Sequence, residues 1–290
     1  MGSKCSTPQA QPDDPPTLLI KKPWRTMKWG ESEKMLQKLQ EFQLNHISEH
    51  LRILVVGPAG AGKSAFITSV NTAIQGRNTC LAHSLSGGNN VTCKYTIYSL
   101  DIDNDGSYPF LFGDTMGLEE GSSTALTKDI ISILHGHVQK EYPFNSETEL
   151  TAESNYYNKT PTLSDKVHCL VFVIPEDRIH SSSDKIVDQI KEILQKAHDL
   201  GIPVVIVMSK VDKVCPHVKE DLKMIYRSKK IKQKLEECSV NLGVPLNYIF
   251  PVKNYHDEIE NNAEVDVLLL TAATNIVNFA NDFVKLTVAK

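Results

Sequence analysis

The chain has 290 residues, of which 41% are hydrophobic and 23% are charged, a composition typical of a globular protein rather than a disordered or collagen-like one. Its 31 Lys and Arg against 35 Asp and Glu give a formal net charge of -4, so no overall positive field favours nucleic-acid binding. Six widely spaced cysteines without a CxxC pair argue against a zinc site and a disulfide scaffold, and for reducing cytoplasm. No apolar run suffices for a membrane span or a secretory signal, so we expect a cytoplasmic protein.

Two segments precede the first predicted strand. Residues 1–30 are rich in Pro, Ser, Gln and Asp, a composition that predicts a flexible tail. Residues 31–50 have apolar side chains at helical spacing and predict an amphipathic helix packed on the following domain. The first six residues fit the myristoylation pattern MGxxx[ST], in which Gly2 would carry a myristoyl chain and Cys5 a palmitoyl chain. A membrane tether through this lipidated N-terminus and a plain tail are both compatible with the pattern.

From residue 51 to residue 290, apolar segments typical of buried strands alternate with amphipathic segments typical of helices. Strands are expected at 51–56, 94–100, 109–112, 167–174 and 203–208 and near 250, and helices near 64–75, 123–137, 184–200, 219–237 and 265–284. The turn sequence Asn104-Asp105-Gly106 predicts that the second and third strands form a hairpin. This alternation predicts an α/β domain of three layers, a mainly parallel sheet with helices on both faces and a ligand crevice at the carboxyl ends of the strands.

A phosphate-binding motif follows the first predicted strand. It reads Gly57-Pro58-Ala59-Gly60-Ala61-Gly62-Lys63-Ser64, with Ala65 next, and matches GxxxxGK[ST] between a strand and a helix. The backbone N–H groups of such a loop surround the β-phosphate, and the helix adds its positive end. Lys63 would bridge the β- and γ-phosphates, while the Ser64 hydroxyl would join the Mg²⁺ shell. We therefore predict a P-loop that binds a nucleotide through residues 57–65.

Two further motifs concern the γ-phosphate and the metal ion. Asp114-Thr115-Met116-Gly117 matches DxxG, so Asp114 is expected to hold Mg²⁺ through water and the Gly117 N–H to contact the γ-phosphate. A threonine from a preceding loop should complete the metal shell. Thr92 is our choice, because the loop Gly87-Gly88-Asn89-Asn90 and a predicted strand flank it, and Thr79 is the alternative.

The base of the nucleotide is expected to contact two loops that come later in the chain. Ser209-Lys210-Val211-Asp212 resembles [N/T]KxD, in which Asp212 would accept two hydrogen bonds from guanine and the Lys210 stem would cover the ring. Adenine offers no such pair of donors, so this motif favours guanine. Val252 and Lys253 follow the last short strand, where G domains place a weaker base-contacting loop.

These motifs, in this order, resemble those of a small-GTPase-type G domain of the P-loop NTPase fold. The closer resemblance is to the interferon-induced protein 44 family, over about residues 51–290. The matching segments are GPAGAGKS, KDIISILHG at Lys128–Gly136, DKVHCLVFV at Asp165–Val173 and VKNY at Val252–Tyr255. The resemblance implies a cytoplasmic, interferon-inducible protein of the immune or antiviral response that binds GTP or GDP with Mg²⁺. Longer members have an N-terminal TLDc domain for which the residues before the first strand here leave no room, so its function does not carry over.

Three departures from an efficient GTPase predict slow hydrolysis and modest affinity. Leu118 occupies the place of the glutamine that orients the attacking water, and Ala59 replaces a frequent glycine. Ser209 replaces the Asn or Thr that ties the base loop to the P-loop. Three hypotheses therefore stand: a switch with slow GTP hydrolysis, a nucleotide-binding scaffold without significant hydrolysis, and an ATP-dependent P-loop enzyme. The first two imply protein effectors and a nucleotide-dependent dimer as partners.

Overall fold

The computed structural model describes residues 18–44, 48–82, 92–102, 106–120, 124–176 and 184–289. Within them, a six-stranded sheet has the order β2-β3-β1-β4-β5-β6. The strands are β1 (Leu51–Val56), β2 (Thr96–Ile102), β3 (Gly106–Asp114), β4 (Cys169–Pro175), β5 (Val204–Ser209) and β6 (Ile249–Pro251). Only β2 runs antiparallel to its neighbour, and the other pairs are parallel. The predicted hairpin and mainly parallel sheet are confirmed.

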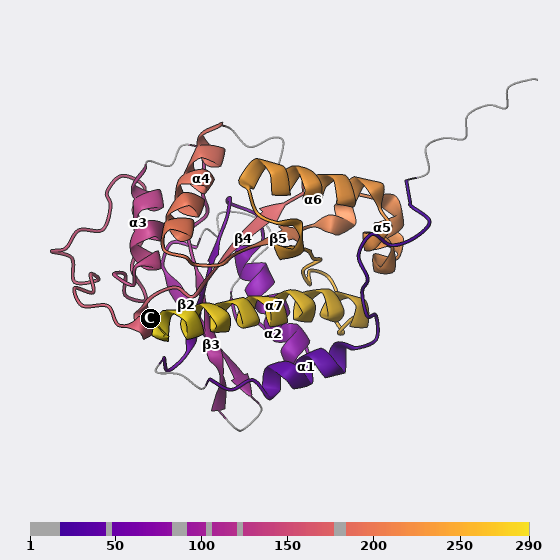
Figure 1. Cartoon of the computed structure of the whole chain (residues 1–290), viewed down its shortest axis with the longest axis horizontal. Coiled ribbons are helices and arrows are strands. Elements are labelled where there is room, and N and C mark those ends of the chain that lie inside the picture. Colours follow the sequence, from indigo (N-terminus) through magenta and orange to yellow (C-terminus); the bar gives the residue numbers. More distant parts are fainter. Residues whose placement is uncertain are drawn as a thin grey trace, which may run out of the picture.

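Helices cover both faces of this sheet, as predicted (Figure 1). They are α1 (Ser32–Gln40), α2 (Lys63–Gln75), α3 (Thr124–Leu134), α4 (Asp184–Asp199), α5 (Pro216–Glu220), α6 (Lys229–Leu242) and α7 (Ala263–Val288). One face packs against α2 and α7, with α1 lying on α7, and the other packs against α3, α4 and α6. The domain therefore has the three layers expected of an α/β fold.

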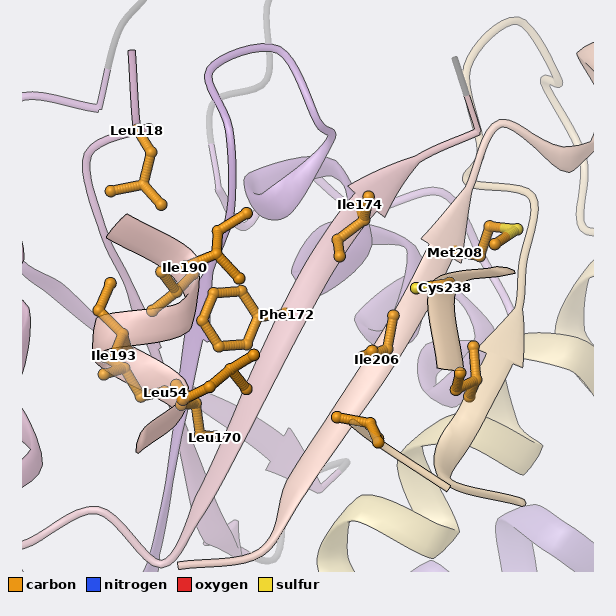
Figure 2. Packing of buried hydrophobic residues seen from close by; sticks show 14 of the residues in the cluster. Leu54, Leu118, Leu170, Phe172, Ile174, Ile190, Ile193, Ile206, Met208 and Cys238 are labelled. Atoms are coloured by element: carbon orange, nitrogen blue, oxygen red, sulfur yellow. The ribbon is translucent and has the colours of Figure 1, made fainter. Parts of the chain in front are cut away.

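The central strands are apolar throughout because both of their faces are buried. Alternate residues of β4 point to opposite sides, so Leu170, Phe172 and Ile174 join one core cluster while the residues between them join the other. Figure 2 shows Phe172 packed beside Ile190 and Ile193 of α4. This packing fixes the sheet, and with it the loops that leave the carboxyl ends of β1, β3, β4 and β5.

Helix α7 is a core element of unusual length. By length and composition alone it is long and apolar enough to cross a membrane, contrary to the expectation that no apolar segment suffices, but 56% of its most apolar stretch is buried inside the domain. Its buried residues, from Val265 to Val284, contact β1, β4, α1 and α2. The core helix of a globular domain can have the same length and composition as a membrane-spanning helix, and these contacts account for the apolar face of α7.

The N-terminal segments differ from the expectation in two ways. Residues 18–30, expected in the flexible tail, lie along the domain, where Trp24 packs edge-on against Tyr226 and Arg25 donates hydrogen bonds to the carbonyls of Leu246 and Ile249. The expected helix at 31–50 is shorter, because α1 ends at Gln40. Tail residues 1–17, which include Gly2 and Cys5, lie outside the described residues.

The basic helix expected at 219–237 is divided. Asp221 adopts an extended conformation (φ -143°, ψ 107°) and ends α5, and its side chain accepts a hydrogen bond from the Lys223 N–H. A short 3₁₀ segment follows, and α6 starts afresh after Ser228, whose hydroxyl accepts from the Ile231 N–H. Aspartate and serine side chains accept hydrogen bonds from nearby backbone N–H groups and so favour the start of a helix over its interior, which explains the break.

Candidate nucleotide-binding site

The P-loop joins β1 to α2 in a path that requires its glycines. Gly60 and Gly62 have positive φ angles of 71° and 94°, a left-handed conformation that glycine adopts without steric cost. A Cβ on Gly57 would lie 2.1 Å from the Val173 carbonyl oxygen, so no larger residue fits beside β4. The loop thus has the compact form that lets backbone groups approach a ligand.

Side chains from two other loops hold three successive P-loop carbonyls. The Lys210 Nζ donates to the Gly60 oxygen (3.0 Å), the Ser209 Oγ to Ala61 (2.7 Å) and the Asn254 Nδ2 to Gly62 (3.1 Å). In a trans peptide the carbonyl and the next N–H point in opposite directions, so the N–H groups of Gly62 and Lys63 face away from these donors.

The same N–H groups belong to the first turn of α2. Helix N-terminal N–H groups have no acceptor within the helix, and α2 begins at Lys63. Four successive donors, on Gly62, Lys63, Ser64 and Ala65, therefore converge at a positive helix end. This is the arrangement that binds phosphate.

Lys63 is buried, with a side chain turned back over the loop. Its Nζ donates to the carbonyls of Gly57 and Pro58, both at 3.2 Å, and the residue is 7% exposed. Burial lowers the pKa of Lys63 to about 8, and the charge of Asp114 opposes this shift. An anion in the loop would remove much of the cost of burying this charge.

This burial predicts a pH dependence of nucleotide binding. A bound phosphate favours the charged ammonium and raises its pKa above 8, so binding takes up a proton when the pH lies between the two values. We expect affinity to be constant below about pH 7 and to fall up to about tenfold per unit above about pH 8. Calorimetry in buffers of different ionisation enthalpy should show proton uptake only in the upper range. An affinity that does not change between about pH 7 and pH 9 would contradict the role of Lys63.

Three oxygen-bearing side chains meet beside Lys63. The Ser64 Oγ donates to the Asp114 Oδ2 at 2.5 Å, and the Thr92 Oγ1 lies 3.3 Å from the Ser64 Oγ and 3.4 Å from the same carboxylate oxygen. Asp114 is 1% exposed, and burial raises its pKa despite its hydrogen bonds to Ser64 and Thr92 and the charge of Lys63. Its Oδ1 is buried without a hydrogen-bond partner among the described residues. Hard oxygen ligands around an unsatisfied carboxylate fit Mg²⁺.

The alternative threonine lies elsewhere. The Thr79 hydroxyl is 3.1 Å from that of Thr72 and 3.4 Å from the Thr68 carbonyl, both on α2. Of the two candidates, the structure brings only Thr92 to Ser64 and Asp114. The glycine-rich loop at 87–90 lies outside the described residues.

The segment after Thr92 is held by the long connection between α3 and β4. The N–H and carbonyl of Tyr95 bond to Tyr142 and Glu141 at 2.8 and 2.7 Å, and the Phe144 N–H donates to the Cys93 carbonyl at 2.9 Å. The Tyr142 hydroxyl in turn donates to Asp129 of α3. The connection between α3 and β4 is thus bonded to the chain within three residues of Thr92.

Leu118 lies against the P-loop but points away from its phosphate side. Its N–H donates to the Gly57 carbonyl and its own carbonyl accepts from the Ala59 N–H, at 3.1 and 2.9 Å. The side chain is fully buried in the core (Figure 2). A Cβ on Gly117 would lie 2.5 Å from the Ala59 Cα, which explains the glycine in DxxG here. Leu118 therefore serves as packing, and it has no group that could orient water.

This burial predicts that restoring the glutamine does not restore hydrolysis. Leu118→Gln places an amide where the leucine side chain meets only core residues, so we expect a loss of about 2 kcal/mol of stability and a melting temperature lower by several degrees. GTP hydrolysis should rise less than about threefold, because the backbone bonds keep side chain 118 in the core. Leu286→Gln is the matched control, since Leu286 is 66% exposed and should tolerate the amide. Faster hydrolysis by more than tenfold with unchanged stability would show that residue 118 faces the phosphates.

The base-side residues have distinct environments. Ser209 is fully buried, and its hydroxyl donates a hydrogen bond to the Ala61 carbonyl of the P-loop. Serine in place of the usual Asn or Thr was expected to weaken this link between the base loop and the P-loop, but the link is present. Lys210 has a positive φ of 60°, and Asp212 is half-buried at the start of a 3₁₀ turn. Val252 is fully buried in the core, so only its backbone is available to a base, and Lys253 pairs with Glu258.

Asn254 is a site residue that the motifs did not identify. Besides its bond to Gly62, its Oδ1 is buried without a partner among the described residues. A Cβ on Gly62 would lie 2.9 Å from the Asn254 Nδ2, so the two residues constrain each other. The neighbouring Tyr255 N–H donates to Ser69 of α2. The segment VKNY marks this position, but local patterns cannot reveal a contact between residues separated by 192 positions, as Asn254 and Gly62 are.

Known proteins resemble this chain in both sequence and fold. No protein-family model matches it. Interferon-induced protein 44 of Homo sapiens is 32% identical over 255 residues, covering 87% of this chain and 57% of that protein. The chain is a homologue of interferon-induced protein 44. The Mus musculus protein (32% over 256 residues, 87% and 60%) and human interferon-induced protein 44-like (32% over 237 residues, 81% and 52%) match similarly. The chain spans about half to three fifths of these relatives.

Solved structures share the fold at low sequence identity. Toc33 from Arabidopsis thaliana in complex with GDP and Mg²⁺ is 13% identical, with a TM-score of 0.50 over 87% of this chain and 93% of that one. A dimerization-deficient mutant of Toc33 gives 14% identity and the same score and coverage. These similarities confirm that this homologue of interferon-induced protein 44 has a P-loop GTPase fold.

Proposed function

We propose that the chain is a guanine-nucleotide-binding protein of the interferon response that binds GTP or GDP with Mg²⁺ and hydrolyses GTP slowly. The observation that carries this proposal is the convergence of Ser64, Thr92 and Asp114 beside the P-loop, together with the bond from Lys210 of the predicted base loop to the P-loop carbonyl of Gly60. The relatives named interferon-induced support the biological setting, and the GDP and Mg²⁺ of Toc33 support the ligands. A cytoplasmic location and protein effectors belong to the same proposal.

Each part of the site has a role in this proposal. The N–H groups of residues 62–65 and the Lys63 ammonium bind the phosphates, and Gly117 lies beside them. Ser64, Thr92 and Asp114 would hold Mg²⁺, which supplies positive charge that stabilises the phosphate oxygens. Asp212 would accept from the N1 and N2 groups of guanine, and Lys210 would cover the ring.

Slow hydrolysis follows from Leu118. Without a water-orienting side chain at this position, we expect single-turnover γ-phosphate release at or below about 10⁻⁴ to 10⁻³ s⁻¹, the range of an unassisted small GTPase. Release near about 1 s⁻¹ from the isolated chain would show that another residue orients water. No release over the lifetime of the complex would favour the second candidate, a nucleotide-binding scaffold, which the burial of Leu118 also supports.

The contacts of residues 93–95 support a switching role. If Thr92 joined the shell of a Mg²⁺ ion bound with a triphosphate, residues 93–95 would shift with it. These residues are bonded to residues 141–144, and Tyr142 is bonded to Asp129 of α3. The connection between α3 and β4 is then the surface to which an effector would bind in a nucleotide-dependent way. Because Toc33 has a dimerization-deficient mutant, we include a nucleotide-dependent dimer among the proposed partners. Sedimentation of the GDP-bound and non-hydrolysable GTP-analogue-bound protein tests this part.

A further inference from the structure

The net charge of -4 conceals a strong segregation of charge. Residues 18–30 and residues 213–234 together contain 12 Lys and Arg but only two Asp and Glu, a net charge of +10. The remaining residues are correspondingly acidic. Charge gathered on two segments has physical meaning only if the fold brings those segments together.

Backbone hydrogen bonds join the two segments. The Lys229 N–H donates to the Leu18 carbonyl at 3.0 Å, the Ile20 N–H to Arg227 at 2.9 Å and the Trp24 N–H to Tyr226 at 3.0 Å. In Figure 1 the N-terminal segment accordingly runs beside α5 and the start of α6. Lys21 and Lys22 therefore lie between two of these contacts, beside Tyr226 and Arg227, just before α6 begins.

Four lysines form what we call the basic face: Lys21, Lys22, Lys229 and Lys230. All four are exposed, and none forms an ion pair with another residue that the structure describes. Of the other lysines of the region, Lys223, Lys232 and Lys234 are paired with Glu264, Glu236 and Glu176, whereas exposed Lys213 and Lys219 form no ion pair with a residue that the structure describes. The two acidic residues of these segments are Glu220, which is exposed, and Asp221, which caps the Lys223 N–H.

The position of two of these lysines is electrostatically unfavourable. Lys229 and Lys230 lie in the first turn of α6, which contains no acidic residue, and the N-terminal end of a helix carries partial positive charge. The four unpaired lysines and the positive end of α6 together give this face a high positive electrostatic potential. A negatively charged partner would relieve the repulsion among these like charges.

The residues beside the face distinguish between anionic partners. Both arginines of the region are used inside the protein: Arg25 bonds to Leu246 and Ile249, and Arg227 donates to the Ile20 carbonyl. Tyr226 is 2% exposed and packs against Trp24. Nucleic-acid recognition uses arginine forks and exposed aromatic rings that stack on bases, whereas both arginines here are bonded within the protein and Trp24 and Trp29 pack against the core. Flexible lysines instead suit a diffuse anionic surface.

We propose that the basic face docks the protein on the anionic surface of a phospholipid membrane. This interaction goes beyond nucleotide binding, because none of the four lysines lies in the P-loop, the metal-side cluster or the base loops. It needs no lipid chain on the protein, since lysines near an anionic bilayer attract it through their charge alone.

Cosedimentation with vesicles tests the proposal directly. The full chain, produced without acylation, is mixed with phosphatidylcholine vesicles that contain or lack phosphatidylserine. The test variant carries Lys21→Glu, Lys22→Glu, Lys229→Glu and Lys230→Glu. The matched control carries Lys140→Glu, Lys159→Glu, Lys185→Glu and Lys191→Glu, which makes the same charge change at exposed lysines of α4 and of the connection between α3 and β4.

We expect the wild type to bind only the phosphatidylserine vesicles and to dissociate as salt rises. The test variant should bind on the order of a hundredfold more weakly, and the control within a few-fold of the wild type. Unchanged GTP affinity shows that each variant is folded, and if the glutamate variant fails this check, glutamine at the same four positions replaces it.

Four results would overturn the proposal. The wild type could bind both kinds of vesicle equally or neither, or the control could lose binding as fully as the test variant, which would reduce the effect to overall charge. A single-stranded RNA oligonucleotide that binds the wild type but not the test variant, with no binding to vesicles, would assign the face to nucleic acid instead.

Discussion

Lys63→Ala is expected to abolish measurable nucleotide binding, a loss of at least about a hundredfold, while leaving the domain folded. The ammonium is buried against two P-loop carbonyls, and charge-assisted bonds from it to bound phosphates would be stronger than neutral hydrogen bonds. Among the described residues it bonds to two carbonyls, and burial lowers its pKa, so the charge is disfavoured there. Removing it should therefore cost little stability.

Titration calorimetry with GTP and thermal unfolding measure the two effects separately. Lys191→Ala provides the control, because this lysine is exposed on α4. An affinity for GTP equal to that of the wild type would show that the P-loop does not bind phosphate. A melting temperature that falls by ten degrees or more would show instead that Lys63 supports the fold.

Asp212→Asn is expected to change the base preference from guanine to xanthine. A carboxylate accepts from both N1–H and N2–H₂ of guanine, whereas an amide can donate to the C2 carbonyl of xanthine and still accept from N1–H. Sites built on such bonds reject the wrong partner by up to roughly 10⁴-fold, because a polar group is otherwise left unpaired. Since Asp212 is only half-buried, water can partly replace the lost partner, and we expect a change on the order of 10²-fold.

Competition between GTP, xanthosine triphosphate and ATP on both proteins checks this exchange. Lys213→Ala, next in the chain and exposed, should leave the order of affinities unchanged. A mutant that loses GTP without gaining the xanthine nucleotide would mean that Asp212 supports the loop but does not contact the base.

The fold was largely predictable because its strongest signals are local. Segments such as 51–56 and 167–174 are apolar throughout, as strands buried on both faces must be, and the structure places β1 and β4 at the centre of the sheet. The break in the helix expected at 219–237 also has local causes, the capping side chains of Asp221 and Ser228. Aspartate and serine also occur at exposed positions inside helices, so the sequence pattern alone could not show whether the helix continues or breaks there.

The features that sequence patterns missed depend on distant partners. Residues 18–30 have the composition of a tail, but Arg25 bonds to carbonyls more than 220 residues away. Asn254 contacts the P-loop across a similar separation, and Ser209 proved to hold the loop that its identity suggested it would loosen. Thr92 was chosen over Thr79 from the loop and the predicted strand that flank it, and the structure brings it to Asp114, whereas the bonds that hold residues 93–95 had no signal in the sequence.

The proposed selection of guanine by the loops around Ser209 and Asp212 can be measured by titrating the nucleotide-free chain with GTP, and separately with ATP, in the presence of Mg²⁺. We predict that GTP binds at least about tenfold more tightly than ATP, because only guanine offers Asp212 two donors. Equal affinities, tighter binding of ATP, or no binding of either nucleotide would contradict the assignment.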